Sequence, residues 1–153
     1  MKRFVFAFML CSCVASVFSQ SKEMGLTPVA PDPVLKGFIK NYGDTKATWK
    51  VTEGNYEATF KLIGMPAMAW FDSTGHKVKV VVEIKADQLP SIALSYIERN
   101  YPKGKIIKAL KWTDDNKVNT FQAEIKLAAE SKILMFTSRG DFIKELEKDK
   151  TIH

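Results

Sequence analysis

Apolar and polar residues alternate with a period of two along several short segments of the chain. Residues 55–62, NYEATFKL, show this most clearly, and residues 119–128, NTFQAEIKLA, show it again. Such alternation predicts strands with one dry and one wet face. In the first segment the dry face carries Tyr56, Ala58, Phe60 and Leu62, and the wet face carries Glu57, Thr59 and Lys61. Further strands are predicted at 46–52, 67–72, 77–84, 105–113, 132–137 and 142–146.

Two segments instead place apolar residues at helical spacing. The first helix is predicted over 33–42, with Asp32 as its N-cap and Pro33 at its first position. The second is predicted to begin at Asp87, its cap, and to end before Pro102. Pro90 is tolerated there because the first turn of a helix does not use its backbone N–H groups.

The chain also repeats itself. WFDSTGHKVK, from Trp70, returns 65 residues later as MFTSRGDFIK, and the same order of helix, Trp-containing strand, alternating strand and glycine turn precedes both copies. We therefore predict an α+β fold made of two tandem units, 33–86 and 87–146, each a helix followed by an antiparallel β-meander. The two units would form one sheet with both helices packed on one face, over a single hydrophobic interior.

Residues 1–19 have the layout of a secretory signal. A basic start, MKRF, precedes an apolar stretch, and small residues stand at Val17 and Ser19 before a cleavage position. We expect cleavage after Ser19 and export to the periplasm or the medium. The segment is too short to span a membrane. The alternative is a lipoprotein, because LCSC loosely resembles a lipoprotein box that would anchor the chain at Cys13. Outside the predicted domain lie an extended leader, 20–32, and a charged tail, 147–153.

Composition and charge narrow the functional classes. The formal net charge is +6, but acidic residues are interspersed with the basic ones, which favours an ordinary mixed surface over a nucleic-acid-binding one. Cys11 and Cys13 are the only cysteines, and both precede the predicted cleavage site. A mature chain without thiols would depend on a packed core for its stability.

Candidate catalytic and metal-binding motifs are weak. The DSTG sequence at Asp72 resembles an aspartic-peptidase motif, but an extra residue separates Asp72 from Gly75, and the second copy carries Thr137 where a paired carboxylate would stand. Gly75 and Gly140 are therefore interpreted as turn glycines. The two histidines show no metal-ligand spacing, and Asp114 to Asn116 lacks a calcium-loop pattern. We predict no catalytic residue, no cofactor and no metal.

The three tryptophans could form a binding platform. Alternation places Trp49 in the core. The same strand face that would carry Trp112 also carries Lys108, so alternation does not decide whether Trp112 lies in the core. Trp70 lies in PAMAWF, which has no wet face. It is either buried or part of an exposed apolar patch, and burial is preferred.

These motifs resemble one known family. The signal-like start, the W-x(6)-YEATF motif from Trp49, the WFDSTG motif from Trp70 and the helix LPSIALSYIERNYP from Leu89 are similar to the PepSY-like, β-lactamase-inhibitor-like proteins of the Gram-negative envelope. The match covers 33–146. The resemblance implies a tandem unit whose sheet presents a concave face to another protein, and it implies roles in restraining peptidases. It carries over no inhibitory residue, because the shared positions are core and turn positions.

We therefore expect an exported, non-catalytic binding module that inhibits or regulates an envelope enzyme such as a peptidase, with an envelope or extracellular protein as its partner. The alternatives are a small ligand-binding protein or hydrolase with an unrecognised site, and a structural envelope protein. The candidate partner-binding residues lie on the predicted polar face or in the Trp70 segment: Trp70, Glu57, Lys61, Glu124 and Lys126.

Overall fold

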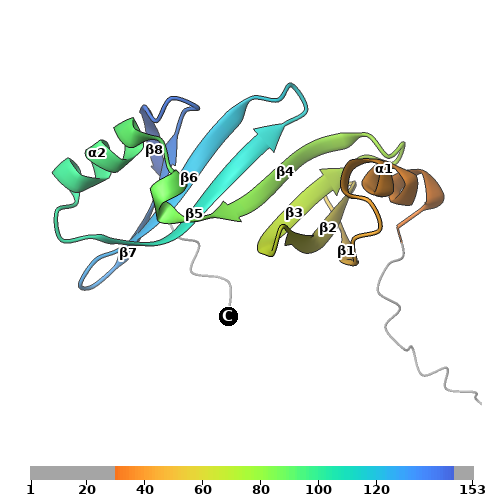
Figure 1. Cartoon of the computed structure of the whole chain (residues 1–153), viewed down its shortest axis with the longest axis horizontal. Helices are drawn as coiled ribbons and strands as arrows, with labels where there is room; N and C mark the ends of the chain where they lie inside the picture. Colours follow the sequence, from red (N-terminus) through yellow and green to blue (C-terminus); the bar gives the residue numbers. More distant parts are fainter. Residues whose placement is uncertain (1–29, 147–153) are drawn as a thin grey trace, which may run out of the picture.

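The computed structural model describes residues 30–146, which form one antiparallel sheet of eight strands in sequence order with two α-helices (Figure 1). Neighbouring strands along the chain are neighbours in the sheet, as expected for short hairpin connections. Helix α1 spans Asp32–Tyr42 and helix α2 spans Ser91–Asn100. The strands are β1 (Ala47–Thr52), β2 (Asn55–Leu62), β3 (Met65–Phe71), β4 (Lys77–Ile84), β5 (Lys105–Asp114), β6 (Asn119–Lys126), β7 (Ser131–Phe136) and β8 (Phe142–Leu146).

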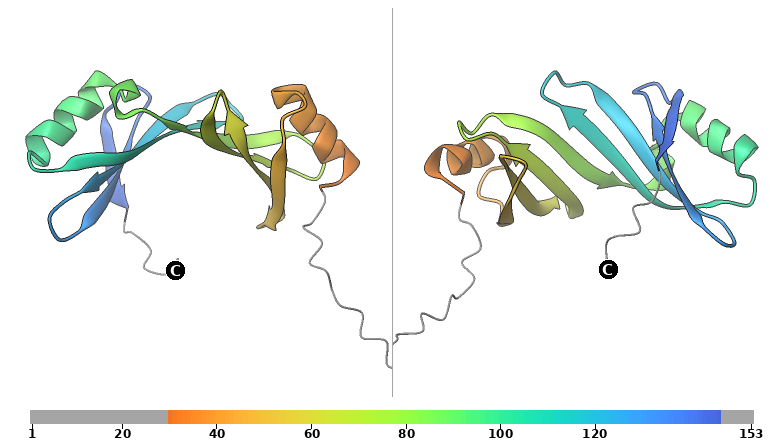
Figure 2. Two further views of the ribbon diagram at one scale, coloured as in Figure 1. Left: turned by 60° about the horizontal axis from the view of Figure 1, so that its bottom comes forward. Right: turned by 180° about the vertical axis from the view of Figure 1, so that it is seen from behind.

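Both helices lie on the same face of the sheet. Val82 on β4 packs in the cluster under α1, and Ala109 on β5 packs under α2. Ile84 is paired with Ala109 and lies two residues from Val82, so these side chains share one face. The left view of Figure 2 shows an arched sheet, with the helices above the two ends of the arch and the other face beneath it. The predicted sheet with helices on one face and a concave opposite face is therefore confirmed.

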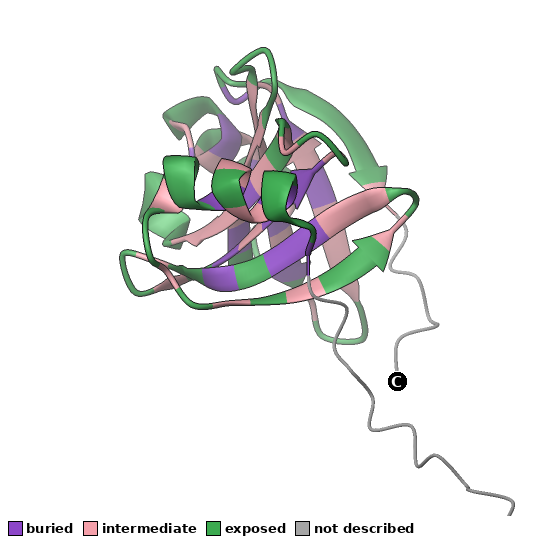
Figure 3. Ribbon diagram, turned by 90° about the vertical axis from the view of Figure 1, so that its right-hand side faces the viewer, coloured by how far each residue is buried: buried purple, intermediate pink, exposed green. Residues whose placement is uncertain are grey.

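The core consists of two clusters, one under each helix, and not of the single interior that the sequence suggested. Val34 and Phe38 of α1 cover residues of β2 and β3, including Phe71, whereas Ala93 and Ile97 of α2 cover residues of β5 to β7. Figure 3 shows α1 turning exposed residues outward, with buried stretches of the sheet behind it. The helices stand over opposite ends of the sheet, so their side chains do not meet in the middle.

The strand boundaries follow the alternation closely, but both helix starts differ from expectation. Asp32 is the first residue of α1 instead of its cap, and Pro31 precedes it in extended geometry. Asp87 lies in a separate 3₁₀ turn, Ala86–Gln88, and makes no cap of α2. Pro90 is the N-cap of α2, with φ −54° and ψ 141°. A Pro at position 90 favours extended geometry in Leu89, which separates the 3₁₀ turn from the helix.

The two copies of the sequence repeat that begins at Trp70 correspond to two glycine turns in the structure. Gly75 and Gly140 have φ of +84° and +99°, values that favour glycine, which confirms the turn interpretation. Each turn also lies against the start of a helix. A methyl group on Gly75 would overlap the carbonyl oxygen of Pro33, and one on Gly140 would lie 2.8 Å from the backbone nitrogen of Ala93. The glycine therefore serves both the hairpin and the seating of the helix in each half.

Trp49 and Trp112 occupy the first strand of their respective halves but lie on opposite faces. Trp49 is paired with Ala58 and packs with the cluster under α1, as predicted. In the second half, the residue paired with Ala123 is Ala109, not Trp112. Trp112 points to the face without helices, where it stacks against Trp70. The two tryptophans are therefore not equivalent positions.

The predicted signal 1–19, most of the leader 20–32 and the tail 147–153 lie outside the described residues, as do Cys13 and the cleavage position after Ser19. Within residues 30–146, no helix is long and apolar enough to cross a membrane.

Candidate functional site: the open face of the sheet

The face of the sheet that carries no helix, here called the open face, combines an apolar centre with polar flanks. Its side chains alternate with those that pack under the helices, so their positions follow from the strand register. The residues that build its centre and flanks are Glu57, Thr59, Lys61, Met68, Trp70, Lys79, Val81, Leu110, Trp112, Gln122, Glu124, Lys126, Met135, Lys144 and Leu146.

Two stacked tryptophans lie at the centre of the open face. The ring centroids of Trp70 on β3 and Trp112 on β5 are 5.9 Å apart, with 19° between the ring planes. Lys79 of β4 lies between the two strands, and its Nζ is 4.5 Å from the Trp70 ring and 5.8 Å from the Trp112 ring. Offset stacking and cation–π contact each stabilise this arrangement. Strands β3, β4 and β5 thus place an aromatic pair and a cation together at the centre of the open face.

Glu57 lies beside this stack as a buried but partnered charge. It faces Trp70 across β2 and β3 and is 5% exposed. Its carboxylate is 3.1 Å from the ammonium of Lys50 on β1, and the Lys50 side chain is largely exposed. An ion pair compensates much of the cost of burying a carboxylate. The Trp70 side chain and the ammonium of Lys50 therefore hold the Glu57 carboxylate in one position.

Val81 is a part of the site that sequence reasoning missed. Alternation in KVKVVVEI placed Val80 and Val82 on the dry face and left Val81 on the wet one. Val81 is nevertheless 1% exposed, because it lies between Met68 on β3 and Trp112 on β5. The run of three valines was the available signal, since such a run is typical of a strand covered on both faces.

Among the described residues, two hollows lie over the middle of this face. One, of about 310 Å³, lies beside Trp112 over β4 to β8, and the other, of about 120 Å³, lies over β2 to β5 beside Met68 and Leu110. The larger one, here called the Trp112 hollow, is lined by Lys79, Trp112, Thr113, Asp114, Val118, Thr120, Gln122, Met135 and Leu146. Gln122 fixes the Trp112 ring, because its Oε1 accepts a hydrogen bond of 3.3 Å from the indole Nε1–H.

The candidate binding residues from the sequence all lie on the open face but do not form one cluster. Trp70 and Glu57 are direct cross-strand neighbours and are buried, as preferred for Trp70. Lys61 lies near the end of β2, whereas Glu124 and Lys126 lie on β6. Three strands separate β2 from β6, which at strand spacing puts these groups about 19 Å apart. The structure thus brings together two of the five residues and adds Lys79, Val81 and Trp112.

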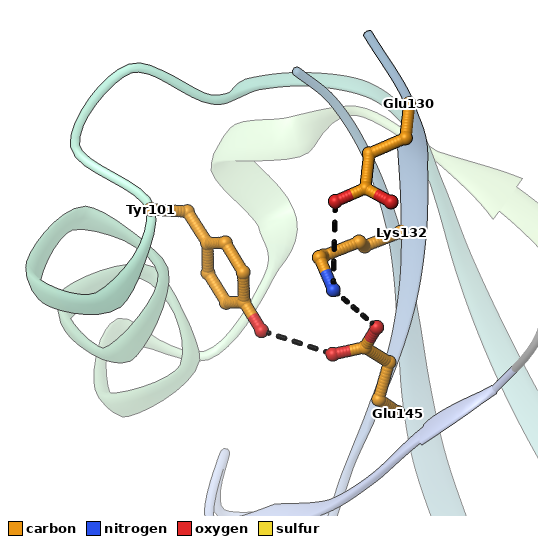
Figure 4. A network of polar contacts seen from close by, with 4 residues as sticks. All are labelled: Tyr101, Glu130, Lys132 and Glu145. Carbon is orange, nitrogen blue, oxygen red and sulfur yellow. Dashed lines mark hydrogen bonds and ion pairs between the residues drawn. The ribbon is translucent and has the colours of Figure 1, made fainter.

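A polar network lies on the helix side of the sheet, between the end of α2 and strands β7 and β8. Lys132 Nζ donates a hydrogen bond of 2.6 Å to Glu145 Oε1, and the Tyr101 hydroxyl donates one of 3.2 Å to Glu145 Oε2 (Figure 4). Glu130 lies 3.7 Å from the same ammonium. The hydrogen bond from Lys132 lowers the pKa of Glu145, and the same bond raises the pKa of Lys132. Burial raises the pKa of the Tyr101 hydroxyl. These shifts favour the charged pair and the neutral phenol, so the network ties the end of α2 to β7 and β8.

Asp72 has a turn-forming role. Its Oδ1 accepts hydrogen bonds from the Thr74 hydroxyl at 2.6 Å and from the backbone N–H groups of Thr74 and His76. The Thr74 hydroxyl is the main reason that the pKa of Asp72 is lowered. In the second turn Thr137 replaces it, accepting a hydrogen bond from the Asp141 backbone N–H at 3.0 Å. Both residues therefore close equivalent hairpins.

The hydroxyl of Tyr42 is a buried titratable group on the helix side of the sheet. Burial raises the pKa of Tyr42 to about 12, and its hydroxyl has no hydrogen-bond partner among the described residues. Within residues 30–146, no cluster of three or more histidine, cysteine or acidic side chains could hold a metal ion.

Comparison with solved structures finds the same fold in proteins of Bacteroides. A DUF2874 family protein from Bacteroides uniformis matches with a TM-score of 0.74 and 20% identity, over 81% of this chain and 94% of that one. A BLIP-like protein from Bacteroides fragilis matches with a TM-score of 0.69 and 18% identity, over 84% and 95%. A protein from Bacteroides eggerthii, provisionally classed as periplasmic, matches with a TM-score of 0.72 and 16% identity, over 77% and 88%.

At these identities the likeness establishes the fold alone, which this chain shares with the BLIP-like protein and the DUF2874 family protein. No protein-family model matches the chain, and no curated protein matches it at a significant level.

Proposed function

We propose that this chain is an exported, non-catalytic binding module whose open face holds another protein of the cell envelope. The observation that carries the proposal is the half-buried Trp112 on the open face, whose ring stacks against the buried Trp70. Tryptophan is a residue that dominates protein interfaces when it lies at the centre of a recognition surface, and a rim of mixed charges surrounds it here. We further infer that the partner is an envelope enzyme, such as a peptidase, which the module inhibits or regulates.

The similar solved structures support this direction. One is named as BLIP-like, and one is provisionally classed as periplasmic. The repeated order of helix and four strands also supports an origin in two tandem PepSY-like units, 33–86 and 87–146. The predicted signal 1–19 supports export, with the lipoprotein anchor at Cys13 as the alternative.

The proposal is tested by capturing partners from an envelope extract with the purified protein. We expect a protein that is retained by the native chain and lost with Trp112→Glu, which places a charge in the centre of the open face. Lys111→Glu is the matched control, because Lys111 is the neighbouring residue on β5 and points to the helix side. Equal retention by both variants would show that binding uses another surface.

An enzyme assay completes the test. If the captured partner is an enzyme, the native protein should lower or alter its activity and Trp112→Glu should not. Turnover of a substrate by the purified module itself would overturn the non-catalytic part of the proposal.

A small ligand-binding protein is the second candidate, and the Trp112 hollow is the observation that favours it. Its volume of about 310 Å³ falls at the lower end of the range for small-molecule sites.

A further inference from the structure

We propose that the Trp112 hollow binds a small organic acid, whose flat apolar body lies against Trp112 and whose carboxylate pairs with Lys79. The inference deepens the second candidate function, small-ligand binding, and it shares Trp112 and the open face with the proposed protein-binding function. It concerns the hollow itself and the chemistry of what fills it.

The shape of the hollow favours a flat apolar body. The Trp112 ring is held on one side by the stack with Trp70 and at its edge by the hydrogen bond to Gln122. A ring fixed in this way presents a rigid aromatic wall, which costs little entropy when a ligand packs on it. Met135 and Leu146 complete the lining, and methionine sulfur packs favourably on aromatic rings. A volume of about 310 Å³ admits a molecule with one or two fused rings.

The charges around the hollow favour an anion. Lys79 holds its ammonium over the tryptophan rings at the hollow, and Lys144 is paired with Met135 on the next strand. Asp114 also lines the hollow as the cross-strand partner of Lys79, but its Oδ1 accepts a hydrogen bond of 2.8 Å from the Val118 backbone N–H, whereas the Lys79 ammonium lies over the tryptophan rings. A lysine ammonium held beside an apolar wall attracts a carboxylate more strongly than a neutral or cationic group.

Polar lining groups fit the same ligand. The Gln122 amide uses its oxygen on Trp112, which leaves the two N–H groups of that amide as donors. Thr120 adds a hydroxyl to the lining. A carboxylate accepts hydrogen bonds from such donors as well as the charge of Lys79.

The experiment titrates the native protein with 2-naphthoate and follows the indole N–H signals of its three tryptophans by NMR. We expect a saturable shift of the Trp112 signal and none of Trp49, which lies on the helix side and serves as the internal control. If the Trp112 shift does not saturate by about 10 mM 2-naphthoate, binding is weaker than millimolar and the proposal is overturned. A shift of Trp49 equal to that of Trp112 would do so too.

The charge requirement is tested separately. Lys79→Gln should weaken 2-naphthoate binding by about five-fold, the size expected for a partly exposed ion pair, and leave the binding of neutral 2-naphthamide unchanged. Lys111→Gln, a lysine on the other side of β5, should change neither. Equal losses in the two variants, or equal binding of the cation 2-naphthylmethylammonium, would contradict the preference for an acid.

The source of the acid is read from competition. If 2-naphthoate displaces a captured envelope protein, the hollow is filled by an acidic group of that partner beside an apolar side chain. If the partner stays bound while the Trp112 signal shifts, the hollow takes a free organic acid. Capture without any naphthoate binding would overturn this inference and leave the proposed protein-binding function intact.

Discussion

At the scale of single residues, the dry face of β2 supplies large side chains to the core under α1. Phe60 is 5% exposed, with its ring centroid 5.1 Å from Phe38 and 4.6 Å from Tyr42. We expect Phe60→Ala to lower the free energy of unfolding by about 3 kcal/mol or more, because the lost ring leaves a cavity among other rings.

Denaturant titration measures this effect. Ile39→Ala is the control, since Ile39 lies on the same helix as Phe38 but is 55% exposed, and it should change the free energy of unfolding by less than about 0.5 kcal/mol. A loss below about 1 kcal/mol for Phe60→Ala would show that this face contributes little to the core.

Individual residues also show where sequence reasoning stops. Phe60 and Trp49 were placed correctly because each lies in a segment whose alternation is unbroken. The face of Val81 followed from the alternation, but its burial did not, because the burial comes from β3 and β5, which lie on either side of it. Ile63 is a second residue whose environment the strand pattern does not predict. It has φ of +51° and is 97% exposed at a hairpin tip, although isoleucine disfavours that geometry. Nothing in the local pattern pointed to it.

At the scale of elements, the contact between glycine turn and helix start predicts an unequal cost for two similar substitutions. Gly54→Ala should cost about 1 kcal/mol, because Gly54 has φ of +77° but open space around it. Gly75→Ala should cost about 3 kcal/mol, because its methyl group would also overlap the backbone at Pro33 and push α1 away. Thermal or denaturant unfolding compares the two, and equal costs would show that α1 moves freely relative to the turn.

The polar network between α2 and the last strands predicts a pH dependence. The lowered pKa of Glu145 means that its contribution to stability is present above the ordinary glutamate pKa and is lost as pH falls through the lowered value. The raised pKa of Lys132 means that its contribution is present below the ordinary lysine pKa and is lost as pH rises through the raised value. The ion pair between Lys132 and Glu145 should therefore stabilise the fold at pH values between the lowered pKa of Glu145 and the raised pKa of Lys132.

Lys132→Met tests that dependence directly. The pKa of the Glu145 carboxyl should rise toward its ordinary range, because Lys132 is the largest cause of its depression. An NMR titration of side-chain carboxyl carbons measures this. Lys144→Met, which removes a neighbouring lysine that faces the other side of β8, should leave the Glu145 pKa where it is. An unchanged pKa in Lys132→Met would mean that the ion pair does not form in solution.

The elements themselves were largely predictable, and their ends were not. Strand positions agreed because hairpin turns such as Glu53-Gly54, with φ of +51° and +77°, are set by a few adjacent residues. The start of α2 was wrong because Asp87 is a good cap by type, and only the extended Leu89 and Pro90 exclude it from that role. Choosing between two adjacent helix starts depends on what the following residues pack against.

At the scale of the whole molecule, the two helix-side clusters are joined by the middle of the sheet. Six residue pairs connect β4 with β5, and the Trp70–Trp112 stack spans the two halves on the open face. We therefore expect one cooperative unfolding transition, although the helices do not touch a common interior.

Residue-resolved NMR during urea unfolding tests this cooperativity. Gly140→Ala, a change in the second half, should lower the unfolding midpoint of first-half amides as much as that of second-half amides. Trp112→Ala combined with Gly140→Ala should separate the two midpoints, because the stack no longer couples the halves. Separate midpoints in the native protein would mean that the halves unfold independently.

By itself, the sequence determined the strands, the glycine turns and the face of the residues in unbroken alternating segments, because alternation and turn geometry act over a few neighbouring residues. Only the tertiary structure decided that the core is two clusters, and that Trp70, Lys79 and Trp112 meet on the open face. Those residues come from three strands and are brought together by strand pairing and by the register shift after Trp70, which sequence spacing does not encode.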